Sequence, residues 1–246
     1  MIELENKKIL LLGASGFIGT RTAILLSKLG AKLILSGRNE SNLKKILPQL
    51  QGHGHQVIPF DLKKIDEISD FVKLSVSIDG NKLSGLVFCN AISTIRPLKS
   101  ITYEFINEMM LTNYYSFIEF IKCFSDKRIS LKGESSIVAL SSYASNNGDK
   151  GQLIYSATKA AIDSSVNVLS KELKSKGIRI NSIRPAALLP EEINFEELPV
   201  SIQKLIENMQ TGPISPESIA EQIAFLLSSS SSGITGKCFD VKGCLE

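Results

Sequence analysis

The sequence is poor in residues that hold metals or form disulfide frameworks. It has only two histidines, His53 and His55, which lie in a Gly-His-Gly-His loop with no third ligand spaced for tetrahedral zinc. Its four cysteines are far apart and lack Cys-x-x-Cys spacing: Cys89, Cys123, Cys238 and Cys244. We therefore expect no metal site and no disulfide scaffold, and we expect the thiols to be free.

Long apolar runs and a strong charge of one sign are also lacking. Charged or turn residues interrupt every apolar run before it reaches the roughly 18 residues of a membrane span. The segment Met1–Lys8 lacks the longer apolar region of a secretory signal. The net charge is only +3, without a basic stripe, which argues against binding to a nucleic-acid backbone but allows an anionic small cofactor. We expect a cytoplasmic protein that binds neither membrane nor nucleic acid.

Short apolar runs alternate with longer amphipathic segments along the whole chain. Seven runs are predicted as strands: Ile9–Leu12, Lys32–Ser36, Gln56–Phe60, Leu86–Cys89, Ser136–Leu140, Ile178–Ile183 and Lys237–Val241. Strands that alternate with helices form parallel sheets covered on both faces. At 246 residues the chain has a length at which α/β folds form one domain, so we predict a single-domain, doubly wound α/β protein.

Several helices are predicted from apolar spacing and capping residues. Two long ones, Thr102–Lys127 and Gln152–Lys176, carry more apolar residues than one buried face needs, which predicts a subunit interface. A helix is also predicted after Ser215, because a capping serine, a first-turn proline and helical periodicity agree there. The segment 186–212 lacks strand character, and we interpret it as a substrate-covering loop and helix.

A glycine-rich turn follows the first strand and opens the first helix. Backbone amides and the helix dipole at such a turn hold a pyrophosphate, although glycines also occur there for packing reasons. The candidate cofactor contacts are Gly13, Ser15, Gly16, Phe17, Ile18 and Gly19.

The end of the second strand indicates which dinucleotide is bound. It reads Ser36-Gly37-Arg38-Asn39, without the carboxylate that binds the ribose hydroxyls of NAD. The guanidinium of Arg38 matches the oxygens of a 2′-phosphate. The sequence therefore predicts NADP(H), the alternative being a solvated arginine at a strand end.

Tyr155 and Lys159 are four residues apart and lie on one face of the second long helix. A phenol has a reference pKa of about 10, and a fixed positive charge nearby favours the phenolate. Tyr-x-x-x-Lys also occurs by chance in many helices, so its neighbours in the sequence decide its meaning.

Taken together, these motifs resemble the short-chain dehydrogenase/reductase family, in its compact single-domain branch, over essentially the whole chain. Ser142 is similar to the family's substrate-binding serine and Asn113 to its helix asparagine. Asp61-Leu62 resembles the adenine-contacting pair, Asn90-Ala91 the Asn-Ala-Gly turn, and Asn181–Pro185 the segment that leads into the nicotinamide loop.

The resemblance implies a Rossmann-type fold and a catalytic tetrad of Asn113, Ser142, Tyr155 and Lys159. It implies hydride transfer between NADP(H) and a carbonyl or alcohol carbon of a small molecule, with Tyr155 as general acid or base. Lys159 would also bind the nicotinamide ribose, and Asn113 would hold a water. Further cofactor contacts implied are Ile92, Pro185 and the backbone amide of Leu188. A homodimer or homotetramer is expected.

The sequence departs from the family pattern at several positions. Gly16-Phe17 reverses the usual order in the glycine loop, Ile92 and Ala186 each replace a glycine, and Pro190 stands where a threonine is common. Two other interpretations therefore stay open. One is a non-catalytic cofactor-binding or scaffold protein, and the other is a nucleotide-sugar epimerase or dehydratase.

Overall fold

The structure, a computed structural model, describes residues 2–189 and 193–243. Its seven strands form one parallel sheet of order β3-β2-β1-β4-β5-β6-β7, which confirms the predicted fold class. The strands are β1 Lys8–Leu12, β2 Lys32–Ser36, β3 Gln56–Val57, β4 Gly85–Phe88, β5 Ser135–Leu140, β6 Ile178–Pro185 and β7 Cys238–Val241.

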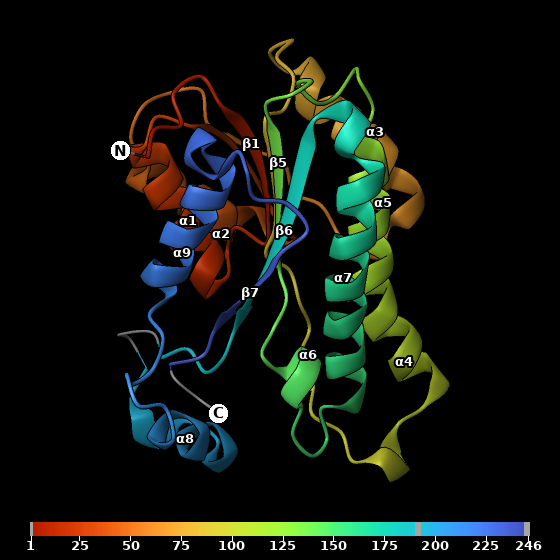
Figure 1. Cartoon of the computed structure of the whole chain (residues 1–246), viewed down its shortest axis with the longest axis vertical. Coiled ribbons are helices and arrows are strands. Elements are labelled where there is room, and N and C mark those ends of the chain that lie inside the picture. The colour runs from red at the N-terminus through yellow and green to blue at the C-terminus, as the bar shows by residue number, and fades with distance from the viewer. Residues whose placement is uncertain (1, 190–192, 244–246) are drawn as a thin grey trace.

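Helices cover both faces of this sheet (Figure 1). Helices α1, α2 and α9 lie on one face, and α3, α5 and α7 lie on the other, while α6 and α8 lie beyond the carboxyl ends of the strands. The helices are α1 Phe17–Lys28, α2 Glu40–Lys44, α3 Ile68–Ser77, α4 Tyr103–Met110, α5 Ser116–Phe124, α6 Ala144–Asn147, α7 Leu153–Glu172, α8 Val200–Glu207 and α9 Pro216–Leu227.

Side chains of one strand alternate between two separate cores. Ile9 and Leu11 of β1 point to the core under α1 and α9, whereas Leu10 and Leu12 point to the core under α5 and α7. All four are at most 1% exposed. Burial of each such side chain contributes roughly 1.5–3 kcal/mol, so the alternation fixes which face each helix covers.

A capping serine and a glycine explain two of the helix ends. The N-cap of α9 is Ser215, whose hydroxyl accepts a hydrogen bond from the Ser218 amide at 3.1 Å, as predicted. Helix α1 ends before Gly30, which has a φ of +90° that other residues rarely adopt. The segment 186–212 includes α8 and the bridge between Leu188 and Ile214.

The predicted helix Thr102–Lys127 is present but is not uniform. A π-helical turn, Leu111–Tyr115, joins α4 to α5. Such turns shift the facing of the helix by inserting one residue, and they are frequent at functional sites. The predicted helix Gln152–Lys176 is α7 followed by a short 3₁₀ turn at Lys174–Lys176.

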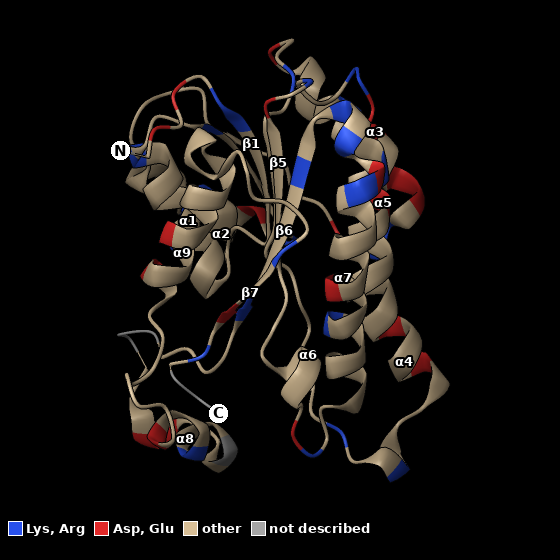
Figure 2. Ribbon diagram, viewed as in Figure 1, with Lys and Arg blue, Asp and Glu red and all other residues tan. Residues whose placement is uncertain are grey.

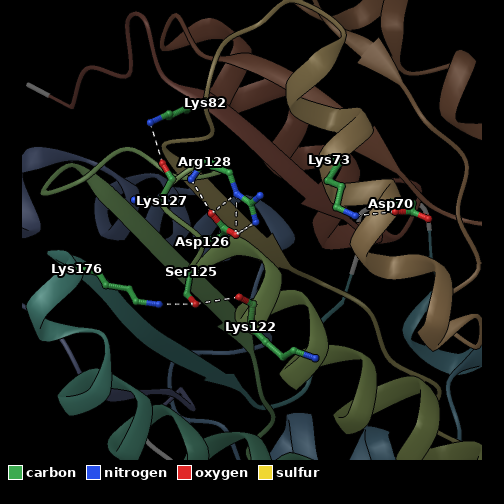
Figure 3. Close-up of polar contacts among 9 residues, drawn as sticks. All are labelled: Asp70, Lys73, Lys82, Lys122, Ser125, Asp126, Lys127, Arg128 and Lys176. Carbon is green, nitrogen blue, oxygen red and sulfur yellow. Dashed lines mark hydrogen bonds and ion pairs between the residues drawn. The ribbon is translucent and has the colours of Figure 1, made fainter.

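Local polar contacts join side chains and loops near the amino ends of the strands (Figure 3). The ammonium of Lys176 donates to the Ser125 hydroxyl at 2.9 Å, and that of Lys82 donates to the Lys127 carbonyl at 2.8 Å. Cations near helix carboxyl ends are favoured by the helix dipole. Charges of both signs are interspersed over the outer helices and loops (Figure 2), and no helix of the described residues is long and apolar enough to cross a membrane.

Candidate active site

The strand order places a crevice at the carboxyl edge of the sheet. The chain continues outward from β1 to β2 and β3, and then returns to add β4 on the other side of β1. Ligands of open parallel sheets bind at such a reversal, outside the carboxyl ends of the central strands. All of the sequence-predicted site residues belong to segments that begin at this edge or line it.

The three glycines of the first turn have different physical roles. Gly13 has a φ of +76°, and a Cβ there would lie 2.9 Å from the Cys89 carbonyl carbon. A Cβ on Gly19 would lie 2.1 Å from the Gly13 oxygen, so these two glycines are required by the fold. A Cβ on Gly16 would meet its nearest neighbour at an ordinary 3.5 Å. The absence of a side chain at Gly16 therefore leaves room for a ligand without being needed for packing.

The amino terminus of α1 is free to bind an anion. Its N-cap, Gly16, provides no side-chain hydrogen bond, and the first turn contains no acidic residue. Ser15 and Phe17 are exposed beside it, and Ile18 is half-buried. The first amides of a helix need partners from outside the helix, so this turn is suited to a diphosphate.

Arg38 lies at the end of β2, next to the glycine turn. Its side chain is exposed and makes no hydrogen bond or ion pair with any residue that the structure describes. The Ser15 hydroxyl lies 3.4 Å from where a Cβ of Gly37 would be, so the arginine adjoins the turn. In the segment after β3, the Asp61 carboxylate accepts from the Lys63 amide at 3.0 Å, while Leu62 is buried.

The turn after β4 also has an unused polar atom. The Oδ1 of Asn90 is buried and has no hydrogen-bond partner among the described residues. Ala91 is exposed and Ile92 is half-buried. Among those residues Asn6 is the only non-glycine residue with a positive φ, so neither Ile92 nor Ala186 occupies a conformation that requires glycine. These two departures leave the backbone of the crevice unstrained.

Asn113 lies in the π-helical turn and is fully buried. Its Oδ1 accepts from the Ile92 amide at 2.9 Å, and its Nδ2 donates to the Ile92 carbonyl at 3.0 Å and to the Thr158 hydroxyl at 3.2 Å. The side chain thus connects the turn after β4 to α7, directly before Lys159. We call this connection a clamp, and it is a role that the sequence alone did not indicate.

Tyr155 and Lys159 project from one face of α7, as predicted. Lys159 is 1% exposed, and its Nζ donates to the Leu140 carbonyl at the end of β5 at 2.6 Å. The same Nζ lies 5.8 Å from the centroid of the Tyr155 ring. Burial lowers the pKa of Lys159 to about 8, while the neighbouring Cys89 and Asp163 act to raise it.

Ser142 completes the group at the start of the segment after β5. Its hydroxyl accepts from the Ala144 amide at 3.2 Å and hydrogen-bonds Tyr155. Burial raises the pKa of Tyr155, and the Ser142 hydrogen bond opposes this rise. The structure therefore brings Ser142, Tyr155 and Lys159 together. Asn113 contacts α7 at Thr158, the residue before Lys159.

A cleft of about 650 Å³ opens from Ser142 and Tyr155. Its walls come from three separate segments: the loop after β4, the α6 region and α8, with Pro185 and Ala186 at its base. The Leu188 amide makes no hydrogen bond to any described residue, whereas the amide of Leu189 pairs with Ile214. Pro190 and Cys244 lie outside the described residues. Sequence periodicity carries no signal for the cleft walls, because no single element forms them.

The chain matches known proteins over nearly its full length. Residues 13–245 match the family described as Enoyl-(Acyl carrier protein) reductase. The 3-oxoacyl-(acyl-carrier-protein) reductase FabG of Rickettsia prowazekii is 31% identical over 99% of this chain and 98% of that protein. The glucose 1-dehydrogenase of Gluconobacter oxydans is 30% identical over 98% of this chain and 92% of that protein. A solved structure described as a putative betaketoacyl-ACP reductase has a TM-score of 0.84 at 25% identity, covering 98% of each chain.

Proposed function

The chain belongs to the short-chain dehydrogenase/reductase family, and from this premise we propose that it is an NADP(H)-dependent oxidoreductase acting on a carbonyl or alcohol carbon. The observation that carries the proposal is the position of Ser142 and Tyr155. Both line the 650 Å³ cleft, and the buried Lys159 lies behind the tyrosine ring at the sheet edge that adjoins the glycine turn.

The residues at the crevice fit a dinucleotide. The uncapped start of α1 and the open space at Gly16 suit a diphosphate. The Oδ1 of Asn90 and the amide of Leu188 have no hydrogen-bond partner in the part of the chain that the structure describes, and they suit hydrogen-bonding groups of the ribose and carboxamide. When bound, the nicotinamide supplies or accepts the hydride.

Side chains of the protein then transfer the proton and stabilise the charge that develops on the substrate oxygen. The Tyr155 hydroxyl donates its proton to the carbonyl oxygen during reduction, and the Tyr155 phenolate accepts the proton of the alcohol during oxidation. The Lys159 ammonium favours the phenolate, and its buried position strengthens this interaction. The Ser142 hydroxyl orients the substrate oxygen and stabilises charge developing on it. Asn113 positions α7 through Thr158.

Arg38 supports the preference for NADP(H) over NAD(H). It has no competing partner among the described residues, and the nearest acid in sequence, Glu40, pairs with Lys44 at 2.7 Å. A 2′-phosphate would therefore meet an exposed guanidinium. The carboxylate of Glu108, on which the charge of Arg38 also acts, is itself paired with Lys63.

The substrate we propose is a small-molecule carbonyl or alcohol that enters between the loop after β4 and α8. Reductases of acyl-carrier-protein thioesters and a sugar dehydrogenase are both among the relatives, and the cleft does not favour one of these classes. We further propose that the segment 186–212 covers the substrate, and that the protein works as a cytoplasmic homo-oligomer. Apolar side chains exposed on α4 and α7, such as Ile106 and Val168, support association through these helices.

The proposal is tested by titrating the protein with NADPH and NADH by calorimetry, alongside the Arg38→Ala variant. We expect NADPH to bind more tightly and its advantage to fall about 10- to 100-fold in the variant, which corresponds to one charge-assisted contact of roughly 1.5–3 kcal/mol. Lys45→Ala is the matched control, because it removes an exposed cation that makes no ion pair with any described residue.

A screen of carbonyl substrates with NADPH then tests the chemistry. Tyr155→Phe should lower kcat at least 100-fold and leave NADPH affinity unchanged. NADPH binding without turnover of any carbonyl or alcohol would instead indicate a non-catalytic protein. Product formation without net NADPH consumption would indicate an epimerase or dehydratase.

A further inference from the structure

Asp163 is a buried carboxylate on α7 that has no part in the mechanism above. It follows Tyr155 by eight residues and Lys159 by four, so all three lie on the same face of the helix. Its side chain is 11% exposed. A buried carboxylate is costly unless it is hydrogen-bonded or faces a cation, so its surroundings decide what it does.

The neighbours of Asp163 satisfy only half of its carboxylate. The Ser182 hydroxyl on β6 donates to Oδ1 at 2.8 Å. Oδ2 is buried and has no hydrogen-bond partner among the described residues, and the closest cation, the Arg184 Nη1, is 4.0 Å away. That guanidinium pairs more closely with Asp240 of β7, at 2.8 Å. Arg184 is therefore shared between the two carboxylates, and it lies closer to Asp240 than to Asp163.

Lys159 is a buried cation on the same face of α7 as Asp163. Side chains four residues apart on a helix have Cβ atoms roughly 5–6 Å apart. Around the Lys159 ammonium lie the Leu140 carbonyl, the Tyr155 ring and the thiol of Cys89, whose pKa burial raises to about 12. This high pKa keeps the thiol protonated near pH 7, so Asp163 is the acidic side chain that acts on Lys159 from α7.

We propose that Asp163 is a positioning residue that keeps Lys159 protonated beside Tyr155. The proposal rests on the proposed function, because a charged Lys159 matters only if Tyr155 exchanges protons. Burial lowers the pKa of Lys159 to about 8, close to physiological pH, although Asp163 acts to raise it. Without the carboxylate a larger fraction of Lys159 is neutral, and a neutral amine neither favours the phenolate nor attracts it electrostatically.

The test measures the titration of Lys159 directly, by NMR of protein labelled at the lysine side chains. The signal is assigned by its absence from the Lys159→Met variant. In Asp163→Asn, which keeps the shape and the acceptor for Ser182, the midpoint should fall by about one pH unit, the low end of the effect of a nearby opposite charge. Glu172→Gln is the matched control, since it removes an exposed carboxylate from the far end of α7 and should leave the midpoint unchanged.

A second variant tests the proposal even if Asp163→Asn does not fold. Asp240→Asn removes a carboxylate that is 44% exposed and frees Arg184 to pair with Asp163, so the Lys159 midpoint should fall by less but in the same direction. Unchanged Lys159 midpoints in both variants would overturn the proposal. The titration needs neither cofactor nor substrate, so a correct shift without any turnover would refute the proposed function alone. If the enzyme turns over, the limb of kcat/KM that reports Lys159 should shift with the NMR midpoint.

Discussion

Replacing Asn113 by alanine should weaken the whole fold, because this side chain connects three segments that are distant in sequence. The substitution leaves both the amide and the carbonyl of Ile92 without their partners. The Thr158 hydroxyl is affected less, since it still donates to the Tyr155 carbonyl at 2.7 Å. Each orphaned group costs about 1–3 kcal/mol, and Ile92 is only half-buried, so we expect a loss of about 2–4 kcal/mol.

The measurement is urea unfolding followed by circular dichroism. With an m-value of about 3 kcal/mol/M, the expected loss lowers the midpoint by about 1 M. Asn107→Ala is the matched control, because Asn107 is exposed on α4 and undergoes the same change of side chain. If Asn113→Ala unfolded at the same urea concentration as this control, the clamp between Ile92 and Thr158 would contribute nothing and the reasoning would fail.

Substitutions in the glycine turn should separate an effect on folding from an effect on cofactor binding. Gly19→Ala should destabilise the protein by about 1–3 kcal/mol, because its Cβ meets a backbone oxygen at 2.1 Å, whereas Gly16→Ala should unfold like the parent protein but bind NADPH more weakly in calorimetry. At acid pH, burial raises the pKa of Asp79 but the Lys8 hydrogen bond and neighbouring groups outweigh it, so the pKa lies below its ordinary value. This contribution to stability is present above about pH 4 and is lost as pH falls further, so urea midpoints of Asp79→Asn should change less between pH 5 and pH 3 than those of the parent; an identical pH dependence would contradict this assignment.

The sequence predicts the sheet well because the strand pattern is local. Apolar runs bounded by turns mark all seven strands, and their predicted limits agree with the structure to within two residues except at the carboxyl end of β3. The predicted strand Gln56–Phe60 ends at Val57, although Ile58 and Phe60 still donate to Leu35 and Gly37. Pro59 has no amide to donate, which interrupts the ladder.

Local sequence patterns do not predict features that depend on tertiary contacts. The π-helical turn interrupts an otherwise regular helix where Asn113 meets the backbone of Ile92, a residue that is 21 positions away. The motif residues of the site were predictable because each follows a strand or lies at helical spacing. The partners of Asn113 and the cleft walls were not, since they come from loops without periodicity.

On helix α7, the residues of the proposed site also hold the helix against the sheet. Residues at intervals of four share one face, and that face must also dock on β5 and β6. Lys159 meets this need through the Leu140 carbonyl, and Asp163 through Ser182. The polar contacts that seat the helix therefore also fix the distance of the ammonium from the Tyr155 ring. If the proposed function holds, a change at Asp163 should accordingly alter proton transfer at Tyr155 before it loosens the helix, because the apolar contacts of Ile162 and Val166 with the core are untouched.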